Sequence, residues 1–178
     1  MTVRQKQVNT NPLKQLKRVL LAVGSNSQNP IVVQMYKNWT RIVRTYLHNR
    51  FTVFSRGGGD WPPLAKRTVD RKKSSLILIE TNTLINALDP GKYNAPGSYA
   101  RRQGDGIVIG YGGSVIHPTA AKSGRSFTIQ QIAEFHQEGG PRLPRRRIIV
   151  GPDRETVVQV TTEVNRAMLA LIREAADT

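Results

Sequence analysis

Apolar residues recur at helical spacing in two long stretches, one in each half of the chain. The first runs from Ile31 to Asn49, and the second begins at Pro152-Asp153, where early acidic residues suit a helix dipole. We predict that both stripes face the core. The first stripe consists of Val32, Met35, Tyr36, Trp39, Ile42, Val43, Tyr46 and Leu47, and the second of Val157, Val160, Val164, Met168, Leu171 and Ala175. The basic residues expected on the other side of the first helix are Lys37, Arg41, Arg44 and Arg50.

Shorter helical patterns lie between these two stretches and before them. Leu13–Val23 has apolar residues at helical spacing, and Thr68–Ile79 reads as an amphipathic helix with Thr68 as its N-cap. Thr83–Leu88 follows Asn82, which tolerates a left-handed backbone and so breaks the helix. A further helix over Thr128–Gln137 is expected to end at the glycine pair that follows it.

The remaining apolar runs are short and read as strands. Gly106–Gly110 and Ser114–His117 are expected to pair through a tight connection, and Arg147–Val150 is the next strand. Arg50–Phe54 is aromatic and β-branched, which indicates an extended piece. Helices that bracket a small antiparallel sheet make an α+β fold. We divide the chain into a basic arm with a short helix over residues 1–30 and a single α+β domain over residues 31–178.

Charge is the most unusual property of the composition. The 178 residues carry a net charge of +15, and residues 1–59 contain no Asp or Glu. This asymmetry suggests an acidic partner, either nucleic acid or an acidic protein surface, although a solvated basic face is the plainer reading. The chain has no cysteine, no secretory signal and no membrane-length apolar run, so we expect a soluble protein of a reducing cytoplasm with no membrane contact.

Candidate chemistry is sparse. His48, His117 and His136 have no acidic neighbours at a metal-binding spacing, and Asp105 between glycines reads as a turn. The glycine run 57–59 lacks the ending of a phosphate-binding loop. We therefore predict no enzyme and no catalytic, cofactor or metal residues. Distant residues can still converge, so a nuclease or hydrolase stays an alternative.

Several stretches, in order, resemble one family: the Mu-like virion morphogenesis, or tail completion, proteins of tailed bacteriophages. The quoted motifs are a Gly-rich turn, Trp-x-x-Leu, a Thr opening a basic helix, Ile-Leu-x-x-Thr-Gly-x-Leu, Val-x-Ile-Gly, Ala-x-x-His-Gln-x-Gly and Ile-Pro-x-Arg-Pro-Phe-Leu-Gly. Here they read Gly57-Gly58-Gly59, Trp61-Pro62-Pro63-Leu64, Thr68 with Lys72-Lys73, Leu78-Ile79-Glu80-Thr81-Asn82-Thr83-Leu84, Val108-Ile109-Gly110, Ala133 with His136-Gln137 and Gly139, and Leu143-Pro144-Arg145-Arg146-Arg147-Ile148-Ile149-Val150-Gly151. In the last motif Arg147 replaces the second proline, Ile148 replaces the aromatic residue, and the glycine comes one place late.

The resemblance implies a structural protein of the phage neck that completes the tail and joins it to the head connector. It implies a ring of identical subunits, hexameric in that family, with tail tube and connector as partners and a lumen in which DNA contact stays open. Location would be the host cytoplasm during assembly and then the virion. The contact residues expected from this reading are Arg4, Lys6, Trp61, Leu64, His136, Arg145, Arg146 and Arg147, with the loop 112–125. The alternative is a nucleic-acid-binding module that uses the basic N-terminal third.

The arginine-rich stretch after the helix at 128–137 has two readings, which do not exclude each other. Pro144 favours an extended entry into the next segment, and Arg146 can donate several hydrogen bonds to carbonyl groups. His136 is expected to bridge backbone groups across the turn. The stretch then serves as a structural junction, as a contact with another subunit, or as both. If it is extended, Arg146 faces opposite to Arg145 and Arg147.

Overall fold

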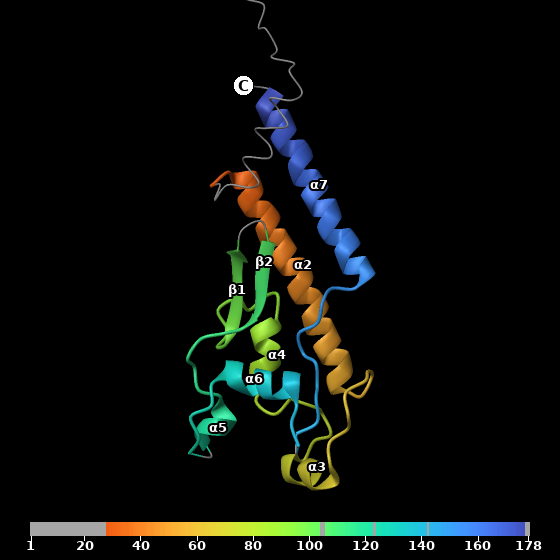
Figure 1. Cartoon of the computed structure of the whole chain (residues 1–178), viewed down its shortest axis with the longest axis vertical. Coiled ribbons are helices and arrows are strands. Elements are labelled where there is room, and N and C mark those ends of the chain that lie inside the picture. Colours follow the sequence, from red (N-terminus) through yellow and green to blue (C-terminus); the bar gives the residue numbers. More distant parts are fainter. Residues whose placement is uncertain (1–27, 104–105, 123, 142, 177–178) are drawn as a thin grey trace, which may run out of the picture.

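The computed structural model describes residues 28–103, 106–122, 124–141 and 143–176. The α+β prediction is confirmed: helices surround one small antiparallel sheet (Figure 1). In chain order the elements are α2 (Pro30–Ser55), α3 (Lys66–Lys72), α4 (Thr83–Leu88), β1 (Ser98–Gln103), β2 (Gly106–Tyr111), α5 (Pro118–Lys122), α6 (Ile129–Glu138) and α7 (Arg154–Ala176). The expected helix 13–23 and the contact residues Arg4 and Lys6 lie outside the described residues.

Helix α2 is longer than its sequence pattern indicates. It starts behind Asn29, whose side chain accepts a hydrogen bond from the Ile31 amide at 2.8 Å, and Pro30 occupies the first turn. The prediction that Arg50–Phe54 is extended is wrong, because these residues continue the helix. Phe51 comes one turn after Leu47, and both are buried in the same cluster, so tertiary packing outweighs the β preference of the segment.

The segment after α2 contains the largest departure from the predicted helices. A helix over Thr68–Ile79 capped by Thr68 is wrong: α3 starts behind Ala65 and ends at Lys72. Lys73 adopts a left-handed backbone with φ 54°, which stops the helix. Asn82 is also left-handed, at φ 57°, and α4 begins directly after it, so the predicted break and the predicted short helix are both confirmed.

The sheet has two strands, of which the sequence predicts one. The strand 106–110 is confirmed as β2, and its partner is β1, in an antiparallel register that pairs Ser98 with Tyr111 and Gln103 with Gly106. The predicted strand over 114–117 is wrong, because only a single bridge joins Ile116 to Thr128. The predicted strand over 147–150 is also wrong, since that segment joins no sheet among the described residues.

Two clusters of buried residues lie along α2. The lower core consists of Leu47, Phe51, Trp61, Ile77, Leu84, Leu88, Ile129, Ala133 and Ile148. The helical arm is the pair of α7 and the first half of α2, held by Val32, Met35, Tyr36, Ala167 and Leu171. The two helices run antiparallel (Figure 1), since Asn29 binds Glu174 and Asn38 binds Glu163 at their paired positions. No helix of the described part is long and apolar enough to cross a membrane.

The final helix is confirmed, but its stripe is only partly buried. The Asp153 carboxylate accepts a hydrogen bond from the Thr156 amide at 2.8 Å and caps the helix. Leu171 is buried and Met168 half-buried, as expected for the face toward α2. Val157, predicted in the core, is exposed, because the first turn of α7 turns its neighbour Thr156 inward instead.

Arg44, expected on the side of α2 opposite the apolar stripe, is instead one of the most buried residues of the helix. It is 1% exposed, and its guanidinium donates to the Ala87 carbonyl at 3.0 Å, the Asp89 carbonyl at 2.7 Å and the Ser98 hydroxyl at 2.8 Å. Burial lowers the pKa of Arg44, and the nearby Tyr93 and Asp89 oppose that shift. Arg44 thus fastens the segment between α4 and β1 to α2.

Helix α6 begins and ends as its sequence predicts. Thr128 and Gln131 form a reciprocal capping box, in which each side chain accepts a hydrogen bond from the other residue's amide. The helix stops at Gly139, which has φ 74°. A Cβ on Gly139 would lie 2.9 Å from the Arg145 Cα, so this glycine also permits close approach of the returning chain.

Candidate functional site

The arginine-rich segment, residues 143–151, follows α6 and passes the loop that comes after α2. We call it the crossing segment. Arg146 is 3% exposed, and its Nη2 donates to the Pro62 carbonyl at 2.9 Å while its Nε lies 3.3 Å from the same oxygen. The Arg146 amide donates to the His136 carbonyl at 2.7 Å. One residue therefore joins the proline loop, the end of α6 and the crossing segment.

The side chain of Gln137 forms the hydrogen bonds that a neighbouring strand would otherwise form with this segment. Its Oε1 accepts hydrogen bonds from the amides of Ile148 at 2.8 Å and Ile149 at 3.0 Å, and its Nε2 donates to the Ile149 carbonyl at 2.8 Å. The Arg147 carbonyl accepts from Trp61 Nε1 at 3.2 Å and from Arg50 Nη1 at 2.6 Å. Side chains, instead of a neighbouring strand, thus bind four backbone groups of residues 147–149.

The three consecutive arginines alternate in direction as expected. Arg145 and Arg147 are exposed, whereas Arg146 points into the protein. Trp61, expected as a partner contact, is 5% exposed and packs edge-on against Phe51 and Phe54. Within a single chain both side chains are therefore largely covered, and their role in partner contact stays a prediction.

His136 does not form the side-chain bridge that the sequence suggests. Its carbonyl accepts from Arg146, but its buried Nδ1 has no hydrogen-bond partner among the described residues. Burial lowers the pKa of His136 to about 4, and the charges of Arg146 and His117 contribute to this shift in the same direction. The imidazole is therefore neutral at pH 7, and it borders a cavity.

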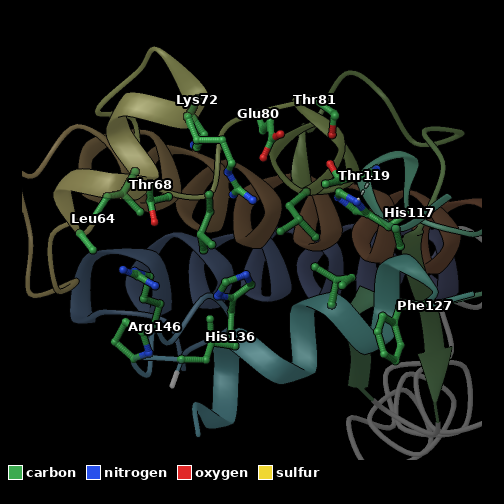
Figure 2. Close-up of a pocket in the computed structure, with 18 of the residues that line it drawn as sticks. Leu64, Thr68, Lys72, Glu80, Thr81, His117, Thr119, Phe127, His136 and Arg146 are labelled. Carbon is green, nitrogen blue, oxygen red and sulfur yellow. Dashed lines mark hydrogen bonds between the residues drawn. The ribbon is translucent and has the colours of Figure 1, made fainter. Parts of the chain in front are cut away.

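That cavity is a cleft of about 500 Å³ between α3, the segment that leads into α4, α5, α6 and the crossing segment (Figure 2). Its polar lining consists of Thr68, Arg71, Lys72, Glu80, Thr81, His117, Thr119, Arg125, His136 and Arg146. Its apolar lining includes Leu64, Leu78, Leu84, Phe127, Ile132 and Leu143. A pocket of this size, with apolar walls and a few converging polar groups, is the usual form of a ligand site.

Many of the residues that carry the family resemblance meet in this cleft. They come from motifs far apart in the sequence, and they are Leu64, Thr68, Lys72, Leu78, Glu80, Thr81, Leu84, His136, Pro144 and Arg146. Three of the expected contact residues, Leu64, His136 and Arg146, therefore border the cleft. Arg145 and Arg147 lie outside its lining.

Arg71 is a cleft residue that the sequence did not indicate. His117 and Arg125 also line the cleft, and they belong to the loop 112–125, which contains α5 and was expected as a contact. His117 is buried, and its Nδ1 accepts a hydrogen bond from the Thr119 amide at 3.2 Å. Only the course of the chain around α5 brings this histidine to the cleft, so no local motif could have indicated it.

Burial shapes the protonation states of the cleft. Desolvation lowers the pKa of His117, and the Glu80 carboxylate opposes that shift. Desolvation also lowers the pKa of Lys72, whose Nζ donates to the Leu76 carbonyl at 2.7 Å. The cleft thus combines neutral imidazoles with partly desolvated cations, a combination suited to holding an anionic group. Within the described residues, no group of three or more His, Cys, Asp or Glu side chains is placed to hold a metal ion.

The chain matches no known family model, no curated protein and no solved structure.

Proposed function

We propose that this protein is a non-enzymatic structural component of the neck of a tailed bacteriophage, which completes the tail and joins it to the head connector. The observation that carries the proposal is the convergence of the resembling motifs. Trp61 and Pro62, His136 and Gln137, and the segment after Pro144 are joined by direct hydrogen bonds. Motifs that are separate in the sequence thus support one another in a single junction and line one cleft.

The surface suits a protein that works by binding its neighbours. Three large apolar side chains on α7 are exposed, and two of them, Val158 and Leu169, are each 57% exposed. A two-stranded sheet also keeps unpaired backbone at its outer edges. In the proposed ring, identical copies pack head to tail through such surfaces, and the ring closes when the rotation between copies closes. Expected partners are further copies, six to a ring by family resemblance, the tail tube and the head connector.

Disruption of the gene in the phage genome that encodes this chain tests the proposal. Electron microscopy of the lysate is expected to show filled heads separated from tails, and purified protein added to that lysate is expected to restore joined particles. An enzymatic or regulatory role predicts a different picture, such as unfilled heads or a normal yield of joined particles. Either of those results would contradict the neck assignment.

Nucleic-acid binding is the second candidate, and one surface favours it. Arg101 and Arg102 of β1 lie with Lys37 and Tyr36 of α2 around a hollow whose described lining contains no Asp or Glu. The Arg102 guanidinium lies 4.3 Å from the centroid of the Tyr36 ring. Cations beside aromatic rings bind phosphates and bases. A DNA titration between about 50 and 200 mM salt checks this: affinity should fall steeply with salt, and Lys37→Ala should lower the slope by about one.

A further inference from the structure

The cleft is lined by more positive than negative charge. Arg71, Lys72, Arg125 and Arg146 border it, and Glu80 is the one carboxylate among the described lining residues. None of these four cations forms an ion pair within the described part of the chain. Elsewhere the carboxylates of Asp60, Asp89, Glu138 and Glu163 each lie within 4.0 Å of an arginine or lysine nitrogen. The positive charge of the cleft therefore lacks an internal counter-ion at contact distance.

Two of the four cations are fixed in place and two are free to adapt. Arg146 is held by the carbonyls of Pro62 and Pro63, and Lys72 by that of Leu76. Arg71 on α3 and Arg125 after α5 are exposed and come from segments far apart in the sequence. A carboxylate entering between them would gain charge-assisted hydrogen bonds from side chains that are not yet engaged.

The apolar part of the lining indicates which groups the ligand carries besides its carboxylate. The apolar side chains of Leu64, Leu78, Leu84, Phe127 and Ile132 all border the cleft. A bare inorganic anion would leave these walls in contact with water, whereas a ligand with apolar groups beside its carboxylate would cover them. The favourable free energy of apolar burial would then add to the ionic contribution.

We propose that the cleft binds an acidic-apolar peptide segment of a different protein: a carboxylate flanked by large apolar side chains. The choice of a protein ligand rests on the proposed function in a multi-protein joint. A second copy of this chain is disfavoured because none of its Asp and Glu residues stands between two large apolar residues in the sequence. The N-terminal segment 1–30 of the same chain cannot supply the carboxylate, since residues 1–59 contain no acidic residue. The negative charge of Glu80 would repel a second carboxylate in the cleft, so we expect the bound segment to carry one.

The test is a titration of the full chain with a blocked heptapeptide that carries one aspartate between leucine and phenylalanine, followed by NMR. We expect saturable shifts of Thr68, Thr81, His117 and Phe127, and a Kd at least tenfold weaker for the peptide with asparagine in place of aspartate. Arg71→Glu is expected to weaken binding at least tenfold. The matched control is Arg67→Glu on the same helix, which lies outside the cleft lining and should change Kd less than twofold.

Three results would overturn the inference. They are the absence of saturable binding, shifts confined to residues outside the cleft, and binding of acetate or phosphate as tight as that of the peptide. Arg125→Glu provides a second variant if Arg71→Glu lowers the melting temperature, because Arg125 is exposed and lies in a different segment. The titration uses the isolated protein, so its failure leaves the neck assignment standing. A negative gene-disruption result would overturn the neck assignment and leave the peptide result standing.

Discussion

The lower core and the helical arm share helix α2 but are held together by different means. In the lower core, irregular segments are fastened by side chains that reach backbone groups, as Arg146, Gln137 and Arg44 do. In the arm, two helices with satisfied backbones meet along one seam of five buried residues. The difference shows where directed hydrogen bonds are needed: a helix brings its own backbone partners, whereas an irregular buried segment must obtain them from side chains.

The largest effect is expected from removing an aromatic side chain of the lower core. Phe51→Ala deletes a ring that is 1% exposed and packs edge-on against Trp61, so unfolding should become easier by about 3–5 kcal/mol. Val53→Ala on the same helix is the control, because Val53 is exposed and should cost less than about 0.5 kcal/mol. Urea unfolding measures both. Equal losses would mean that the lower core is not centred on this ring.

Acid is expected to destabilise the fold through the buried imidazole of His136. Burial holds the pKa of His136 at about 4 in the folded protein, below its ordinary value of 6.5. The unfolded chain therefore takes up the proton first, so this contribution is full above pH 6.5, declines as the pH falls toward 4, and then levels off. The loss amounts to about 3 kcal/mol. His117, whose pKa is also lowered, acts in the same direction.

Urea unfolding at several pH values between about 4 and 7 measures this slope. The variant His136→Gln is the matched comparison, and its stability should depend less on pH across the same interval. NMR titration of the His136 ring gives the direct check. A ring that titrates near its ordinary value would show that the imidazole is solvated in the folded protein and would remove the basis of the prediction.

The arm should open separately from the lower core. Leu171→Ala removes a side chain from the seam between α7 and α2, at an expected cost of about 2–3 kcal/mol, the lower end for a buried leucine. Hydrogen exchange should speed up in α7 while α4 and α6 keep their protection. Leu169→Ala, two positions away and exposed, should change neither. Uniform loss of protection across the whole chain would show that arm and lower core unfold as one unit.

The smallest expected effect is the difference in stability between the Arg146→Ala and Arg145→Ala variants. Arg146→Ala leaves the Pro62 carbonyl without its donor and should cost about 1–3 kcal/mol. Arg145→Ala removes an exposed side chain that bonds to the Gln137 carbonyl at 3.1 Å and approaches Glu138, and should cost less than about 1 kcal/mol. Thermal melting compares the two variants. The reverse order of damage would mean that the crossing segment sits in a different register.

The helical part of this fold is largely readable from the sequence. The stripe of α2, the cap and stop of α6 and the start of α7 each follow from local chemistry, and the structure confirms them. The errors concern positions where local preference and tertiary contacts disagree. Lys73 and Leu78 adopt left-handed backbones, which neither residue type favours, so no sequence rule ends a helix at Lys72.

The sheet and the cleft were less predictable for a different reason. Strand β1 contains Ser98, Arg101, Arg102 and Gln103 and lacks the alternation of a half-buried strand, so its pattern does not identify it. The direction of Arg146 could be predicted, because consecutive residues of an extended segment alternate. The positions of His117 and Arg125 beside it could not, since they depend on the course of the chain between β2 and α6.

The adjacent glycines at the end of α6, Gly139 and Gly140, look equivalent in the sequence but should tolerate different substitutions during evolution. Gly140 has no atom within 4 Å of the place where a Cβ would stand, so alanine and serine are expected to persist there in a saturation-mutagenesis library. Gly139 is left-handed and lies against the backbone of Arg145, so every substitution is expected to disappear from the same library under selection for folded protein. Homologues of this chain should therefore drift at the second glycine and stay constant at the first.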